Sequence, residues 1–326
     1  MPSTNYYPMV QYHDLLERIL EEGIRRPNRT GVDTYFIPGE MLKFDLRHGF
    51  PAITTKQLAF KNAKGELLGF FRGYTNADQF SSLGCNVWYA NANETVSWVN
   101  SPYRLGPNEN GRIYGAQWLD WADWRIVHTL AEAQEWKAKG YEPHIWRDDG
   151  NGRGDFALRG SLNQLETALR TLIANPTDRR IIISAWRPDE FDRMSLPPCH
   201  VAYQFLADTE NKVLHMTLWQ RSYDSFLAYN IPIGAMFLEI MARLSGYTAG
   251  SYTFFISDCH IYTSHIAQVK ELLSRDHYPA PSLVLNDRIK PVTLAEIPGV
   301  FSRIEPADIT LEGYRCHPPI KAPMAA

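Results

Sequence analysis

Residues 233–247, IGAMFLEIMARLSGY, are apolar around nearly the whole circumference of a helix, and such a helix is expected to be buried on all sides. The chain also contains runs rich in β-branched and aromatic residues, separated by turn residues: RRIIISAW (179–186), HVAYQFLAD (200–208), VLHMTLWQ (213–220) and YTFFISDCHIY (252–262). Runs of this composition are typical of strands. We therefore predict a single α+β domain over residues 1–326, with a mostly antiparallel twisted sheet packed around a central buried helix.

Apolar residues at helical spacing predict further helices in residues 10–24, 63–73 and 161–176. Residues 120–160 differ from the rest of the chain because they are polar and rich in glycine and tryptophan, as in DDGNGRGD (148–155). We interpret this segment as an insertion or a long surface excursion. No internal repeat and no linker divides the sequence.

The composition is that of an average globular protein, with 44% hydrophobic and 21% charged residues among 326. The formal net charge of −3 and the lack of a long basic run favour neither nucleic acid nor a membrane surface as a partner. No apolar run approaches the roughly 18 residues of a transmembrane helix, and the N-terminus does not resemble a signal peptide. We expect a soluble cytoplasmic protein, or one in the host cytoplasm if a phage encodes it.

The four cysteines are scattered without CxxC spacing: Cys85, Cys199, Cys259 and Cys316. We therefore expect no zinc site and no other metal. Cys199 follows two prolines in SLPPCHVAYQF (195–205), and their fixed φ angles could aim a nucleophile, although a free cysteine is more often a small buried apolar residue. Arg221 could supply the positive charge that a thiolate needs, whereas His200 should point to the opposite face of its strand.

Other polar side chains stand out by their position. Glu66 lies in the apolar stretch ELLGFF, where a carboxylate is costly unless it is paired or catalytic. Asp258, His260 and Tyr262 share one face of a predicted strand and would suit the hydroxyl groups of a sugar. Other polar residues are weak signals when taken singly: Arg29, Arg179, Arg180, Gln220, Ser222 and Asp224.

The order of these motifs carries more information than any one of them. The set is RTG (29–31), ELL (66–68), VW (87–88), YGAQW (114–118), DRR (178–180), SAW (184–186), LPPCH (196–200), QRSYD (220–224), DCHIY (258–262) and IKAP (320–323). This set resembles the folate-dependent thymidylate synthase family, from about Arg29 to the C-terminus. The segment 120–160 is similar to an extra segment in the longer bacterial members.

The resemblance implies a homodimer that acts on a deoxypyrimidine monophosphate. Cys199 would add to C6 of the pyrimidine, and C5 would then attack the methylene group of 5,10-methylenetetrahydrofolate, the co-substrate. The implied catalytic residues are Cys199, Glu66, Tyr114 and Arg221. The implied nucleotide-binding residues are Arg29, Arg179, Arg180, Gln220, Ser222, His260 and Tyr262, with Arg179 and Arg180 donated by the partner subunit. The implied folate-binding residues are Trp88, Asp224, Leu227 and Ala326.

The sequence departs from the family pattern near the base and the folate. Where the family carries F-L-G-x-P-F-N-I, residues 226–233 read FLAYNIPI, so Ala228 stands for the glycine and Pro232 for the base-reading asparagine. Proline has no side-chain donor or acceptor, and Asn230, two residues earlier, is the candidate to replace it. Tyr89 also stands where the family has an aspartate, and the chain ends in Ala326 instead of a larger apolar residue.

These departures favour an enzyme that keeps the first half of the reaction and lets water resolve the C5-methylene adduct. Our preferred interpretation is a deoxyuridylate hydroxymethyltransferase that forms 5-hydroxymethyl-dUMP. The main alternative is a thymidylate synthase, which converts dUMP to dTMP and releases dihydrofolate. Two further alternatives are a deoxycytidylate hydroxymethylase and a catalytically inactive regulator that binds nucleotide or RNA.

Overall fold

The computed structural model describes residues 7–322. Its α-helices are α1 (Val10–Glu22), α2 (Phe60–Phe71), α3 (Ala77–Ser82), α4 (Tyr89–Glu94), α5 (Val96–Val99), α6 (Tyr114–Leu119), α7 (Leu130–Ala138), α8 (Gln164–Ala174), α9 (Asn230–Ser245) and α10 (Ile266–Leu273). Its strands are β1 (Ile24–Arg26), β2 (Thr34–Asp45), β3 (Trp121–Thr129), β4 (Glu142–Asp148), β5 (Arg153–Leu162), β6 (Ile182–Ser184), β7 (His200–Asp208), β8 (Val213–Gln220), β9 (Tyr223–Asp224), β10 (Thr248–Tyr262), β11 (Ser282–Leu285) and β12 (Ile309–Glu312). Short 3-10 helices cover Leu46–His48, Pro188–Arg193, Thr263–His265, Phe301–Arg303 and Pro306–Asp308.

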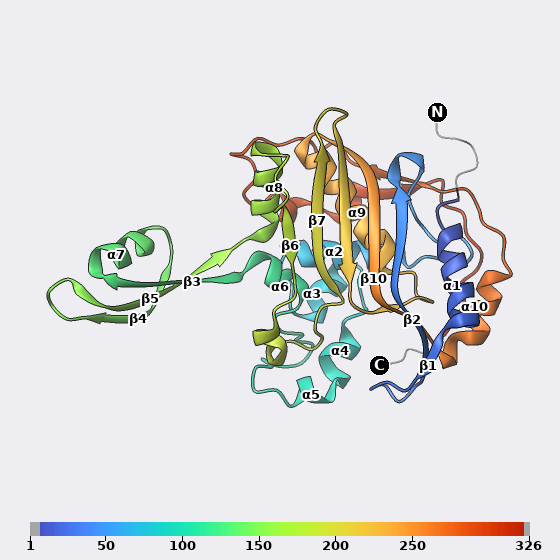
Figure 1. The fold of residues 1–326 in the computed structure, drawn as a ribbon, viewed down its shortest axis with the longest axis horizontal. Coiled ribbons are helices and arrows are strands. Elements are labelled where there is room, and N and C mark those ends of the chain that lie inside the picture. The colour runs from blue at the N-terminus through green and yellow to red at the C-terminus, as the bar shows by residue number, and fades with distance from the viewer. Residues whose placement is uncertain (1–6, 323–326) are drawn as a thin grey trace.

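The main sheet has the strand order β1-β2-β10-β8-β7-β6, and β9 also pairs with β10 (Figure 1). Most neighbours are antiparallel, as the sequence predicts, but β8 and β9 run parallel to β10. The parallel pair β8 and β10 is joined through α9, because two parallel strands need a crossover connection between them. The mixed α and β fold with a mainly antiparallel sheet is therefore confirmed, with the correction that its centre contains a parallel pair.

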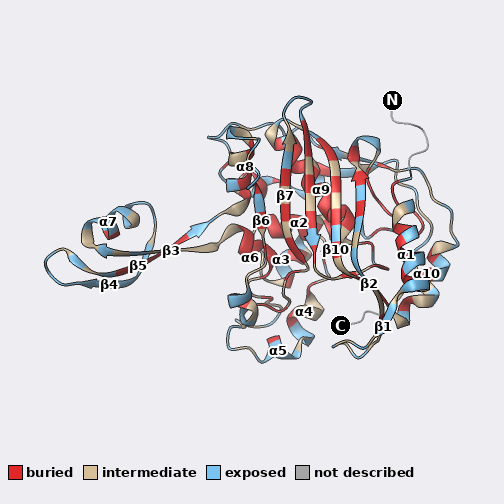
Figure 2. Ribbon diagram, viewed as in Figure 1, coloured by how far each residue is buried: buried red, intermediate tan, exposed pale blue. Residues whose placement is uncertain are grey.

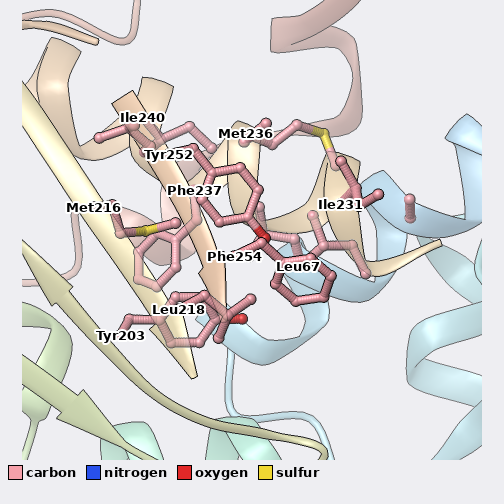
Figure 3. Close-up of a cluster of buried hydrophobic side chains, with 14 of the residues drawn as sticks. Leu67, Tyr203, Met216, Leu218, Ile231, Met236, Phe237, Ile240, Tyr252 and Phe254 are labelled. Carbon is pink, nitrogen blue, oxygen red and sulfur yellow. The ribbon is translucent and has the colours of Figure 1, made fainter. Parts of the chain in front are cut away.

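Helix α9 is the buried centre of the protein. Twelve of its sixteen residues are buried, and its start at Asn230 places Pro232 in the first turn, where the missing N–H breaks no helical hydrogen bond. Figure 3 shows side chains of α9 packed with others from α2, β7, β8 and β10. Phe237 lies at the middle of this cluster, with its ring centroid 5.0 Å from that of Tyr203 and 5.2 Å from that of Phe71.

Residues 121–162 form an arm that projects from the body (Figure 1). Its three strands have the order β3-β5-β4, and α7 packs on one face around a small apolar cluster that includes Phe156 and Leu158. Trp121 pairs with Leu162, so the two ends of the arm lie side by side where they join the body. The arm is thus a regular sheet despite its polar composition. The composition is polar because the arm buries few of its residues.

Buried residues dominate the strands of the main sheet (Figure 2), but some large apolar residues of these strands are exposed. Met41, Phe255 and Trp219 are direct neighbours across β2, β10 and β8, and they are 60%, 39% and 48% exposed. Large apolar side chains that share one sheet face and remain exposed are typical of an interaction surface. No helix within residues 7–322 is both long and apolar enough to cross a membrane.

Candidate active site

Cys199 lies directly before β7, at the end of the proline-rich approach that the sequence indicated. Its backbone N–H donates a hydrogen bond of 2.6 Å to the hydroxyl of Tyr114, the first residue of α6. Burial raises the pKa of the Cys199 thiol, and the Arg221 guanidinium opposes that rise. The structure therefore combines a partly buried thiol with the nearby cation that a reactive thiolate requires.

Arg221 follows β8 and fixes the loop that carries the cysteine. Its Nε donates to the carbonyl oxygen of Pro198 (2.9 Å), and its Nη2 donates to that of Pro197 (2.7 Å). The Arg221 N–H donates to the carbonyl of Cys199 (3.0 Å), so the two residues are adjacent as predicted. Arg29, distant in sequence, adds a smaller electrostatic effect that opposes the rise in the pKa of Cys199.

Two polar neighbours complete this side of the site. Gln220 is fully buried, its Nε2 donates to the carbonyl of Ser222 (2.8 Å), and its Oε1 has no hydrogen-bond partner among residues 7–322. Ser222 is partly exposed and lies between Arg221 and the short strand β9. Gln220 and Arg221 therefore lie beside His200 and Cys199, respectively.

Glu66 lies on α2 and is only 6% exposed. Burial raises the pKa of its carboxyl to about 8, and interactions with the Tyr229 hydroxyl and the Trp88 indole N–H partly oppose this rise. The polar atoms of Tyr229 and Trp88 are buried, and neither makes a hydrogen bond of standard geometry within residues 7–322. A buried carboxyl that can hold or release a proton near neutral pH is suited to general acid–base catalysis.

His200 and Asn230 meet on the other side of the cysteine. Burial lowers the pKa of His200 to about 4, so its ring is neutral at physiological pH, and Asn230 interacts with the ring. The His200 Nδ1 is 2.6 Å from the hydroxyl of Tyr203, and its ring packs edge-on against Tyr114 at 5.4 Å between centroids. His200 is thus a poor general base, as the sequence predicts, but it connects Asn230 to the surroundings of Cys199.

The three residues that the sequence assigns to a sugar lie together on β10. Asp258 accepts an ion pair from Arg26, its Oδ1 is 3.0 Å from His260 Nδ1, and the rings of His260 and Tyr262 are 5.2 Å apart. Asp224 pairs with His260 through the β9–β10 register, so the folate-binding candidate and the sugar-binding candidate are neighbours.

Lys56 adds a positive group that the sequence analysis missed. Its Nζ lies 3.9 Å from the centroid of the Phe226 ring, and burial lowers its pKa to about 8 while Asp224 opposes this change. The residue lies in an unremarkable TTKQ segment (54–57), so composition gives no signal for it.

Three predicted residues are not joined to this cluster in the single chain. The Arg180 guanidinium is 87% exposed and pairs with Asp178, and Arg179 precedes β6 at the edge of the main sheet, where its carbonyl accepts from Gln204. Ala326 lies outside the described residues. No group of three or more potential metal-ligating side chains occurs within residues 7–322.

Tyr229 and Asn230 are adjacent at the start of α9, and they influence the pKa of Glu66 and of His200, respectively. They follow Ala228, whose φ of 54° lies in the left-handed region that a residue with a side chain rarely adopts. Asn230 is a candidate from the sequence alone, whereas Tyr229 is not. The nearest signal was the replacement of a glycine by Ala228 at this turn.

The whole chain is similar to known proteins. A family model described as thymidylate synthase matches residues 10–326. A protein named thymidylate synthase from Bordetella parapertussis is 42% identical over 323 residues, which cover 97% of this chain and 100% of that protein. Proteins of the same name from Pseudomonas syringae pv. tomato and Pseudomonas putida are 40% and 41% identical, with the same shares covered.

Proposed function

We propose that this chain converts deoxyuridylate to thymidylate in the cytoplasm. It belongs to the thymidylate synthase family and is therefore a one-carbon transferase with 5,10-methylenetetrahydrofolate as co-substrate. The family resemblance deduced from the motifs is thereby confirmed. The observation that supports the proposed chemistry best is that Arg221 lies next to Cys199, while the buried carboxyl of Glu66 also influences the pKa of the Cys199 thiol. The names of the relatives favour methylation over the hydroxymethylation that the sequence departures suggested. We assign the reaction to one catalytic domain, residues 1–326, with the arm as its insertion.

In this proposal the chain's residues act in a fixed order. Cys199 forms a bond from its sulfur to C6 of the pyrimidine, which makes C5 a nucleophile toward the methylene carbon. Glu66 moves protons at the pyrimidine, and Tyr114 assists. The C5 proton leaves, and Cys199 departs from C6 once the carbon unit is in place. In methylation, the co-substrate also supplies a hydride and becomes dihydrofolate.

The nucleotide would bind through residues from four segments of the chain. Arg29, Arg221 and Ser222 supply donors for a phosphate dianion, for which several guanidinium groups are well suited. His260 and Tyr262 face the 3′-hydroxyl of a deoxyribose. Asn230, linked to His200, takes the base-reading position that Pro232 cannot fill.

The co-substrate would bind between the nucleotide and solvent. Leu227 supports this location because its apolar side chain is 44% exposed beside the buried Phe226. The indole N–H of Trp88, which makes no hydrogen bond of standard geometry within residues 7–322, and the carboxyl of Asp224 provide one donor and one acceptor for a polar ring such as the pterin.

We further propose a homodimer formed through the uncovered face of the main sheet. The row Met41, Phe255 and Trp219 gives this face an apolar centre, as expected for a dimer interface. Arg179 and Arg180 precede β6, the edge strand of the same sheet, and their positive charge would complete the phosphate site of the partner.

Hydroxymethylation is the second candidate, and one observation favours it. The turn 228–232 replaces the family's apolar loop by one in which Tyr229 and Asn230 influence the pKa of Glu66 and of His200, which adds polar groups where the methylene intermediate would form. Polar groups can hold a water molecule, and water attack gives a hydroxymethyl product without oxidation of the folate.

The deciding experiment is mass analysis of products from the purified protein with 5,10-methylenetetrahydrofolate and either dUMP or dCMP, while absorbance reports dihydrofolate. Thymidylate with dihydrofolate supports the first candidate. A 5-hydroxymethyl nucleotide without dihydrofolate supports the second, and the consumed base identifies the substrate. No product from either nucleotide would contradict both and favour an inactive regulator, for which the Cys199→Ala variant should retain full biological function.

A further inference from the structure

A cavity of about 240 Å³ lies between the arm and the body of the protein. The arm supplies Trp124 and Arg159, which are directly opposed on β3 and β5. The body supplies Arg112, which comes shortly before α6, and residues 187–193 at the 3-10 helix that precedes the Cys199 loop. No residue that lines this cavity is among the catalytic, nucleotide-binding or folate-binding candidates.

Carboxylates hold two of the cavity's arginines in place. Glu190 is only 5% exposed and accepts hydrogen bonds from Arg112 Nε (2.6 Å) and Gln117 Nε2 (2.7 Å). Asp120 accepts from Arg112 Nη1 (2.8 Å) and, with both of its carboxylate oxygens, from Arg159 Nη2 (2.9 Å). The guanidinium groups of Arg112 and Arg159 are therefore positioned before any ligand binds, which lowers the cost of binding.

Two further arginines keep unused hydrogen-bonding capacity. The guanidinium of Arg187 lies over the ring of Trp121, 4.9 Å from its centroid, and its buried Nη1 has no hydrogen-bond partner within residues 7–322. A guanidinium carries donors only, so the missing partner must be an acceptor, and a buried donor without one is costly. Arg193 is exposed, packs against the ring of Tyr103 and forms no ion pair in the described part of the chain.

The charge around the cavity favours an anion. Its four arginines outnumber the three neighbouring carboxylates, Asp120, Asp189 and Glu190. Asp189 is the most loosely held of these, because its side chain is 67% exposed and lies 3.2 to 3.3 Å from the nitrogens of Arg187. Exposed ion pairs contribute little to stability, so an incoming anion can replace Asp189 on Arg187.

Phosphate matches this cavity better than other oxyanions. Several guanidinium groups surround the cavity, and a phosphate group offers three strong acceptor oxygens and nearly two negative charges. The volume is smaller than the roughly 300 Å³ at which pockets for drug-sized ligands begin, which favours a small anion. The exposed part of Trp124 adds one apolar wall for an organic group.

We propose that this cavity binds the phosphate group of a small anion, which is either inorganic phosphate or a phosphomonoester. Arg187 and Arg193 donate to it from the body, and Arg159 donates from the arm. The bound phosphate ties the arm to the body, because its partners come from both. The site does not depend on the reaction at Cys199.

The test is residue-resolved labelling of arginines in the full chain with phenylglyoxal, followed by mass spectrometry of peptides. Sodium phosphate at millimolar concentration should slow the labelling of Arg193 by about threefold or more, the effect of phosphate at twice its dissociation constant. Sodium chloride at equal ionic strength should not. Arg170 of α8 is the matched control, since it is exposed, forms no ion pair within residues 7–322 and should be labelled at an unchanged rate.

A second readout reports on the arm itself. Amide hydrogen exchange at its base, in residues 121–124 and 159–162, should slow when phosphate binds. Arg193→Gln should abolish this effect without breaking an ion pair, and Arg170→Gln should retain it. Arg187 is left unchanged, because the adjacent Trp186 packs against Arg221, whose Cζ is 5.5 Å from its ring centroid.

Ribose 5-phosphate separates the two sources of phosphate. Protection of Arg193 at a lower concentration than inorganic phosphate requires identifies a phosphomonoester, and the reverse order identifies the free anion. Phosphate that protects only Arg29 and Arg221 overturns the inference, because it then binds only at the proposed nucleotide site. Equal protection by sodium chloride also overturns it, as does the same arm response in Arg193→Gln and wild type. These outcomes are independent of product analysis, so failure of the proposed function would leave this inference untouched.

Discussion

Replacing Glu66 by glutamine removes a carboxyl that can ionise while keeping nearly the same side-chain shape. The pKa of this carboxyl is raised to about 8 by burial, against 4.5 for an ordinary glutamate. Between these two values the folded protein keeps the proton and the unfolded chain releases it, so the free energy of unfolding falls as the pH rises. At 1.36 kcal/mol per unit of pH, the loss reaches about 4 kcal/mol at pH 7.5 and levels off above pH 8.

Glutamine is neutral at every pH and does not incur this loss. We therefore expect Glu66→Gln to match the wild type near pH 4 and to be more stable by up to about 4 kcal/mol at pH 7.5, while its turnover falls by roughly 10²- to 10⁴-fold. Urea denaturation followed by circular dichroism from pH 4 to 9 measures the difference. The exposed Glu94 of α4 gives a matched control, since Glu94→Gln should change stability by less than about 0.5 kcal/mol at any pH. A stability difference between Glu66→Gln and the wild type that does not grow with pH would refute the reasoning.

Four further results are expected. Cys199→Ala should form no product by mass analysis, and any residual turnover would exclude it as the nucleophile. Arg221→Met should slow the alkylation of Cys199 by iodoacetamide at pH 7 to 8, because the opposing cation is lost; an unchanged rate would contradict this electrostatic role. Phe237→Ala should lower the free energy of unfolding by about 3–5 kcal/mol in urea, whereas a loss below about 1 kcal/mol would show that the core collapses around the gap. Trp219→Glu should give a monomer by sedimentation, with weakened nucleotide binding if the partner supplies arginines; a persistent dimer would place the interface elsewhere.

The sequence predicted the central part of the fold correctly because its signals are strong and local. The helix around Phe237 is apolar on nearly all sides, and the strands beside it are rich in β-branched and aromatic residues. The sequence did not predict that β8 and β10 are parallel, although a helix between two strands permits that connection. The arm was missed as a regular structure because its core is small, and most of its residues remain exposed.

Some residues of the candidate site could be predicted from the sequence and others could not, for a physical reason. Cys199, Arg221 and Glu66 stand out as unusual residue types in their local sequence, and the structure places Arg221 next to Cys199. Tyr229 does not stand out, since it follows a left-handed backbone at Ala228 that the sequence shows only as a missing glycine. Lys56 was missed because its role depends on burial against Phe226, a contact between segments far apart in the chain.

The pairing of Trp121 with Leu162 at the base of the arm has a topological consequence. Directly opposed residues of antiparallel strands have Cα atoms about 4.5 to 5.5 Å apart, a gap that one or two glycines could bridge. The arm can therefore be excised, or extended at the turn 149–152, without threading any chain through the body. The fold thus contains a modular attachment point, at which a fluorescent protein or an affinity domain could be grafted some distance from the reacting cysteine.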